Sequence, residues 1–74
     1  MKSNETYVPQ VGDSVDATRI EHSRIYFNRI VGPVTQVWPN ACLVSFPFGK
    51  HNETVEWRLY FNEWNFSFLH KSDQ

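Results

Sequence analysis

Residues 55–69 read VEWRLYFNEWNFSFL, and apolar and polar side chains alternate at both ends of this stretch but not in its middle. Its first five residues alternate between apolar and charged side chains, which is the two-residue period of a strand with one buried face. The same period returns near its end, at Phe66 and Phe68. Between them, YFNEW (60–64) breaks the alternation and has the length of one 3₁₀ turn. The stretch therefore predicts two strands joined by a helical turn.

Short runs rich in β-branched and aromatic residues, bounded by Gly, Pro and Asn, recur along the rest of the chain. They predict strands over residues 14–20, 29–38, 41–46, 54–59 and 65–69. Gly32-Pro33 predicts a bulge or sharp bend in the second strand, because proline cannot donate to a ladder. Five short strands, a long first loop (20–28) and one helical turn before the last strand predict an all-β, five-stranded SH3-like barrel. The alternative is an OB-type barrel, which usually has a helix between its third and fourth strands; no stretch offers one.

The 74 residues predict one domain, with a flexible N-terminal segment at 1–10, a barrel at 11–69 and a flexible C-terminal tail at 70–74. Period-two alternation assigns a set of apolar side chains to the interior: Val15, Val34 or Val37, Val44, Phe46, Val55, Trp57, Leu59, Phe66 and Phe68.

The composition of the chain indicates the cellular compartment in which the protein is expected. Cys42 is the only cysteine, so no disulfide can form within the chain, and it lies in an apolar run. The N-terminus is polar, and no apolar run approaches the roughly 20 residues that span a bilayer. We expect a soluble protein of the cytoplasm or another reducing intracellular compartment, monomeric when isolated.

The residues that could carry chemistry are few and scattered. The possible metal ligands are widely separated in sequence, and no two of them have the close spacing of a metal site, so neither a metal nor another cofactor is expected. These residues are His22, Cys42, His51 and His70. Cys42 is the only strong nucleophile candidate, and no polar residue adjoins it in sequence. We therefore expect a protein that is not an enzyme.

The first loop is more informative, because Arg19, Arg24 and Arg29 flank Tyr26 and Phe27 in a chain whose net charge is −1. This combination suits docking onto an acidic protein surface, where Arg and Tyr are favoured contact residues. It also suits nucleic acid, although three arginines and a lysine are few charges for a duplex. A solvated loop with scattered charge is the third interpretation.

Five aromatic rings are in excess of the predicted core: Trp38, Phe48, Tyr60, Phe61 and Trp64. They predict either an exposed binding patch or rings that cap the ends of the barrel. If the first loop and the helical turn border one groove, Tyr26, Tyr60 and Trp64 converge there. The predicted protein-binding residues are therefore Arg19, Arg24, Tyr26, Arg29, Trp38, Tyr60 and Trp64.

Two groups of barrels resemble parts of this sequence. Val11-Gly12-Asp13-x-Val15, the spacing Phe27-x₄-Gly32-x-Val34-x₂-Val37, and Leu43-Val44-x-Phe46 resemble the KOW and Tudor group of SH3-like barrels. ACLVSF followed by VEWRLYFNEW looks like the small SH3-like subunits of photosynthetic electron-transfer complexes, namely the one found in photosystem I and the ferredoxin-docking one of the plastid-type NDH complex. Both resemblances imply a scaffold that docks onto proteins or nucleic acids.

The resulting expectation is a non-enzymatic protein-binding module. It would serve as a small accessory subunit or regulator of a larger machine, either of the transcription or translation type or an electron-transfer complex, and a phage-type inhibitor of host machinery is included. The alternative is a nucleic-acid-binding KOW- or Tudor-like barrel that uses Arg19, Arg24, Arg29 and exposed aromatic residues.

Overall fold

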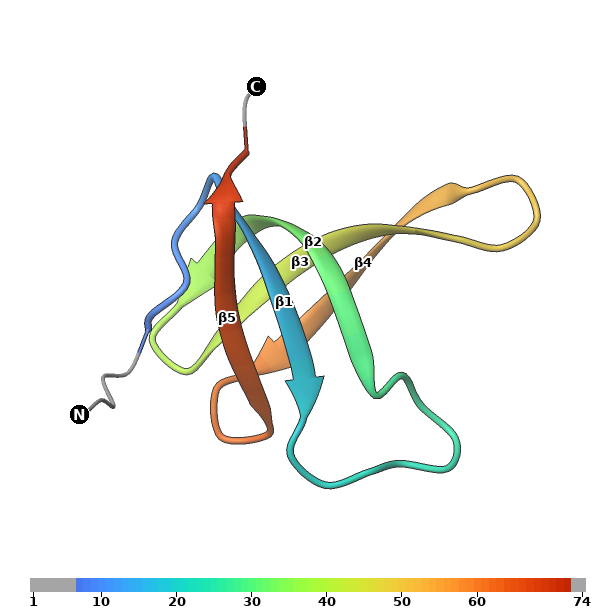
Figure 1. Ribbon diagram of the computed structural model, residues 1–74, viewed down its shortest axis with the longest axis horizontal. Coiled ribbons are helices and arrows are strands. Elements are labelled where there is room, and N and C mark those ends of the chain that lie inside the picture. The colour runs from blue at the N-terminus through green and yellow to red at the C-terminus, as the bar shows by residue number, and fades with distance from the viewer. Residues whose placement is uncertain (1–6, 73–74) are drawn as a thin grey trace.

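The computed structural model describes residues 7–72 and consists of five antiparallel strands (Figure 1). The strands are β1 (Asp13–Arg19), β2 (Arg29–Trp38), β3 (Ala41–Phe48), β4 (Glu53–Tyr60) and β5 (Trp64–Lys71). Their order in the sheet is β4-β3-β2-β1-β5. The all-β, five-stranded, barrel-like fold predicted from the sequence is confirmed. The described part of the chain has no helix long and apolar enough to cross a membrane.

The sheet curls because β2 changes partner halfway along its length. Pro33 pairs with Ser14 of β1, whereas Val34 pairs with Val44 of β3, and the register shifts just beyond, between Val34 and Gln36. In Figure 1, β3 and β4 accordingly cross β1 and β5 at a steep angle. A Cβ atom on Gly32 would lie 2.0 Å from the carbonyl oxygen of Ser45, so only glycine lets the two strands approach so closely. The strand changes partner directly after Gly32-Pro33, where the sequence predicted a bulge or bend, and the register shift itself lies slightly further on, between Val34 and Gln36.

The core lies on the inner face of this curled sheet. Its fully or almost fully buried members are Val15, Ala17, Ile30, Val34, Cys42, Val44, Phe46, Leu59 and Trp64. Three other predicted core residues, Val55, Trp57 and Phe66, are half-buried and pack against these. The prediction for Phe68 is wrong, because its side chain is 47% exposed. Phe68 lies on β5, which pairs only with β1, and the Tyr7 ring covers it from 5.7 Å.

Residues 61–63 form a tight turn between β4 and β5, so the predicted 3₁₀ turn is not present. The Glu63 N–H donates to the Tyr60 carbonyl over 2.9 Å, and the Phe61 N–H donates to the Asn40 carbonyl over 3.0 Å. A single i-to-i+3 bond closes a turn but does not continue as a 3₁₀ helix. The turn ends at Glu63 because the next residue, Trp64, is the first residue of β5 and pairs with Arg19 of β1.

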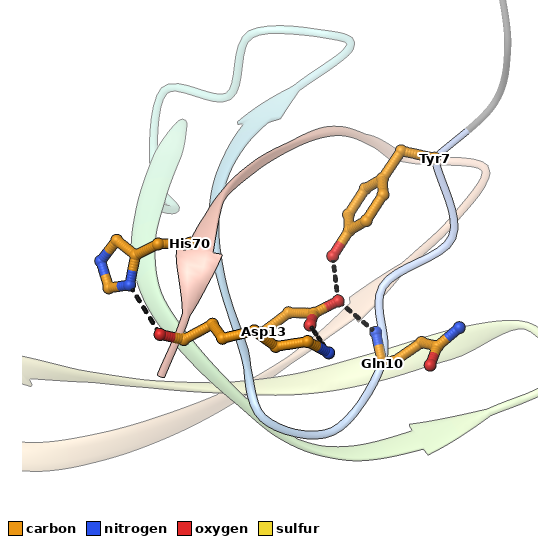
Figure 2. Close-up of polar contacts among 5 residues, drawn as sticks. Tyr7, Gln10, Asp13 and His70 are labelled. Carbon is orange, nitrogen blue, oxygen red and sulfur yellow. Dashed lines mark hydrogen bonds and ion pairs between the residues drawn. The ribbon is translucent and has the colours of Figure 1, made fainter. Parts of the chain in front are cut away.

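Residues 7–10 pack against the barrel, although the sequence places them in a flexible segment. Pro9 is fully buried. The Tyr7 hydroxyl and the Gln10 N–H both donate to the Asp13 carboxylate, the latter over 3.2 Å (Figure 2). Lys71, predicted in the tail but part of β5, completes this group through an ion pair of 2.7 Å. Residues 1–6 and 73–74, the rest of the two predicted flexible segments, lie outside the described residues.

Asp13 is only 3% exposed and is the buried charge of this group. The bond from Lys71 and then that from Tyr7 hold the pKa of its carboxyl below its usual range, against the effect of burial. Burial and the adjacent carboxylate raise the pKa of the Tyr7 phenol. The group therefore ties the segment before β1 to the end of β5, and we interpret it as structural.

Candidate functional site

The first loop, residues 20–28, has a fixed shape because Asn28 closes it. The Ser23 N–H donates to the Asn28 side-chain oxygen over 2.6 Å, and the Asn28 amide donates to the Ser23 carbonyl over 2.8 Å. The Ser23 hydroxyl oxygen then accepts the N–H groups of Ile25 and Tyr26, at 3.2 and 3.0 Å. The backbone that carries Ile25, Tyr26 and Phe27 is therefore ordered by local polar contacts.

Phe27 joins this loop to the hairpin of β3 and β4. Its ring centroid lies 5.2 Å from that of Phe46, 5.1 Å from that of Phe48 and 5.2 Å from that of Trp57, and all three pairs are edge-to-face. Edge-to-face ring pairs at such distances stabilise a fold by an attraction between the rings, in addition to the stabilisation from the apolar area that they bury. The loop is thus clamped onto strands that lie about 20–30 residues further along the chain.

A surface of aromatic side chains results from this clamp. Tyr26 is 57% exposed and its centroid is 6.4 Å from that of Trp57, while Phe48 is 54% exposed. Ile25, beside them in the loop, is 78% exposed. We call Tyr26, Phe48 and Trp57, with Phe27 at their centre, the aromatic platform. Apolar groups gathered in this way on a small domain typically mark a contact surface.

Sequence reasoning placed only Tyr26 of this platform among the site residues. It counted Phe48 as a surplus ring and Trp57 as core. Period two does connect Phe46 with Phe48 along β3, so a signal for the hairpin half of the platform was present. No local signal links Phe27 to the hairpin, because that contact depends on how the chain folds back.

Trp64 is a core residue, and its prediction as an exposed anchor is wrong. Its side chain is 2% exposed. Strand β5 begins at Trp64, so the alternation seen at Phe66 and Phe68 extends one step further back, onto the same face. The missed signal was this period, which places Trp64 opposite Arg19 at the inner face of the sheet.

The three predicted arginines differ in what holds them. Arg19 donates from Nε to the Phe27 carbonyl over 2.8 Å and lies 4.5 Å above the Trp64 ring, so it braces the loop. Arg29 forms a two-pronged pair with Asp16 at 2.7 and 3.0 Å, which lowers the pKa of the Asp16 carboxyl. Arg24 has no ion-pair or hydrogen-bond partner within residues 7–72 and is exposed.

Trp38 and Tyr60 lie away from the platform, on the opposite face of the sheet. Trp38 and Tyr60 are both paired with Ala41, and the Arg58 side chain lies between the two rings. The expected convergence of Tyr26, Tyr60 and Trp64 is therefore not found. One ring belongs to the platform, one to the outer face and one to the core.

Cys42, the candidate nucleophile of the sequence, is buried in the core. Burial raises the pKa of the Cys42 thiol to about 11, so it is protonated and weakly nucleophilic near neutral pH. No group of three or more His, Cys, Asp or Glu within residues 7–72 is placed to hold a metal ion.

An open hollow of about 420 Å³ lies between the first loop and the turn at 61–63, and Glu21, His22 and Glu63 are among the residues that line it.

Comparison of the chain with protein-family models, with curated proteins and with solved structures finds no match.

Proposed function

We propose that the protein is a non-enzymatic binding module that docks onto a larger protein through the aromatic platform. The observation that carries this proposal is the exposure of Tyr26 and Phe48 on a support that Phe27 and Asn28 hold rigid. A rigid aromatic surface loses little conformational entropy when it is covered, so more of its burial appears as affinity. Tyrosine and tryptophan also dominate the energetics of measured protein interfaces.

The charges around the platform suit a protein partner better than a nucleic acid. Of the lysines and arginines in residues 7–72, only Arg24 and Lys50 have no ion pair, hydrogen bond or cation–π contact. Arg24 adjoins Ile25 in the loop, and Lys50 lies two residues beyond Phe48. These two cations beside the platform can steer a partner with a modest negative charge, whereas nucleic-acid binding usually rests on several phosphate contacts.

The role proposed for such a module is that of a small accessory subunit or regulator. It would dock onto a transcription- or translation-type machine, including the case of a phage-type inhibitor, or onto an electron-transfer complex, as the two sequence resemblances imply. The barrel-like fold supports both kinds of assembly equally, since function depends on the surface that a fold carries.

The proposal is tested by capturing partners from an extract of the native host with the tagged protein. The double variant Tyr26→Ala, Phe48→Ala removes the two most exposed rings of the platform. The control is Val11→Ala, Leu69→Ala, since Val11 and Leu69 are similarly exposed but lie outside the platform. We expect the control to retain the same partner as the wild type, and the platform variant to retain at least about tenfold less.

Circular dichroism of each variant establishes that it is folded. Equal retention of the partner by a folded platform variant would remove the platform from the binding surface. Capture of nucleic acid alone, abolished by a nuclease, would favour the alternative function.

A further inference from the structure

A second contact surface lies on the outer face of β2, β3 and β4. Residues that are directly opposite in neighbouring strands share a face, and the pairs Trp38–Ala41 and Ala41–Tyr60 run across all three strands. Leu43 and Arg58 form the next pair on this face. The sequence predicted Trp38 and Tyr60 as contact residues but did not single out the arginine between them.

Arg58 is held by the two aromatic residues. Its guanidinium carbon lies 4.3 Å from the centroid of the Trp38 ring, and Nη1 lies 3.5 Å from the Tyr60 hydroxyl, to which it donates a long hydrogen bond. Ala41, the small residue between the two rings in the sheet, is 1% exposed. A side chain larger than alanine would occupy the space over which the guanidinium extends, so the alanine helps to shape this surface.

The edge of the Arg58 guanidinium remains available to a partner. No carboxylate within residues 7–72 forms an ion pair with it, and its residue is exposed. The nearest acid on this strand face is Glu56, two residues earlier on β4, which makes no ion pair with Arg58 either. A guanidinium carries five N–H donors in a plane, and within residues 7–72 only Nη1 of Arg58 has a hydrogen-bond acceptor, the Tyr60 hydroxyl.

We propose that Trp38, Arg58 and Tyr60, with Leu43 beside them, bind a short acidic segment of a partner protein. Arg58 would take a carboxylate of that segment in a two-pronged contact, while Trp38 and Leu43 cover an apolar side chain next to it. The charge of this surface favours an acidic peptide as its partner, because one arginine beside apolar groups is complementary to one carboxylate beside an apolar side chain. A nucleic-acid strand would bring several phosphates past Glu56 and gain a single charge contact.

This surface is separate from the aromatic platform. Trp57 faces the inner side of the sheet, where it contacts the first loop, and Arg58 follows it on the outer side. The inference therefore does not depend on the proposed function of the platform. If both surfaces are used, β4 lies between two partners, and the small domain bridges them.

The test is titration of the ¹⁵N-labelled full chain with an acidic hexapeptide that alternates glutamate and leucine, compared with the same peptide carrying glutamine for glutamate. We expect the acidic peptide alone to shift the Arg58 Nε–H and Trp38 Nε1–H resonances, and to leave those of the Tyr26 backbone unchanged. Arg58→Gln should weaken binding by about tenfold. Arg58→Lys keeps the charge but loses the planar stack, and should weaken it nearly as much.

Two further variants sharpen the result. Glu56→Gln removes the neighbouring negative charge and should strengthen binding by several-fold, whereas Arg24→Gln, in the first loop, should leave it unchanged. The inference is overturned if the acidic peptide shifts neither resonance, or if Arg58→Lys binds as well as the wild type. It is also overturned if single-stranded oligothymidine shifts the same resonances at lower concentration than the peptide does.

Discussion

Trp64 and Tyr26 are both large aromatic residues, but one is buried and the other faces solvent. Trp64 is 2% exposed and Tyr26 is 57% exposed. Removing a buried ring leaves a cavity, so Trp64→Ala should lower the free energy of unfolding by about 3–5 kcal/mol. Tyr26→Ala removes only a partly covered ring and should cost less than about 1 kcal/mol. Urea denaturation followed by tryptophan fluorescence and circular dichroism measures both.

The loss at Trp64 is a large share of the stability of a 74-residue domain, so Trp64→Ala is expected to be largely unfolded at physiological temperature. Trp64→Phe keeps a ring in the same place and serves as the milder variant. A Trp64→Ala protein as stable as Tyr26→Ala would mean that β5 does not begin where the structure has it.

The bend in β2 depends on a single residue without a side chain. Gly32→Ala would place a methyl group 2.0 Å from a backbone oxygen of β3, and neither strand can move without breaking the ladder. We expect a loss of at least about 2 kcal/mol in the free energy of unfolding. Gly12→Ala is the matched control. A Cβ added to Gly12 would meet no atom within 4 Å apart from its chain neighbours, but the φ of Gly12 is +96°. The variant therefore carries only the backbone strain of an alanine at positive φ, about 1–2 kcal/mol. Thermal denaturation of the two variants separates crowding from strain.

The segment before β1 is attached to β5 through the Asp13 carboxylate, and this attachment responds to acid. The pKa of Asp13 is lower in the folded state than in the unfolded chain, so its contribution is present above its unfolded pKa, which is about 3.9. That contribution disappears as the pH falls through the lower, folded pKa. Asp13→Asn should therefore destabilise the protein at pH 7 by about 1–3 kcal/mol, and by much less under strongly acidic conditions.

Denaturation midpoints measured from neutral to strongly acidic pH test this linkage. Tyr7→Phe removes one donor but leaves the carboxylate and Lys71, so it should keep a pH dependence close to that of the wild type. Parallel pH profiles for Asp13→Asn and the wild type would show that other carboxylates cause the acid sensitivity.

The two-residue alternation of apolar side chains predicted the strands. The prediction was wrong where this alternation is interrupted, at residues 60–64. It identified β4 and most of the core, because each follows from the alternation of residues close in sequence. It also indicated the part of β2 where the strand changes partner. It placed the start of β5 one residue late, and that error turned Trp64 from a core residue into a surface anchor. The platform depends on Phe27 meeting a distant hairpin, which no window of sequence contains.

In residues 7–72, most of the basic side chains serve internal contacts. The net charge is −1, Arg29 and Lys71 are in ion pairs, and Arg19 and Arg58 are stacked on tryptophans. Aromatic side chains, by contrast, are exposed on the platform and half-exposed on the outer face. The described residues therefore offer apolar contact area with few basic side chains that have no internal contact, which suits a protein-binding surface.

This balance predicts weak binding to duplex DNA. Of the lysines and arginines in residues 7–72, Arg29 and Lys71 are in ion pairs, which leaves Arg19, Arg24, Lys50 and Arg58 to neutralise at most a few phosphates. The logarithm of the affinity should therefore fall only shallowly with the logarithm of salt concentration. In fluorescence anisotropy with a labelled duplex at about 50 mM salt, we expect a Kd weaker than roughly 100 μM. Arg29→Gln should leave this unchanged, because Arg29 is already paired with Asp16. Micromolar binding with a steep salt dependence would instead mean that the ion pairs open to accept phosphates, and the nucleic-acid function would then replace the protein-binding one.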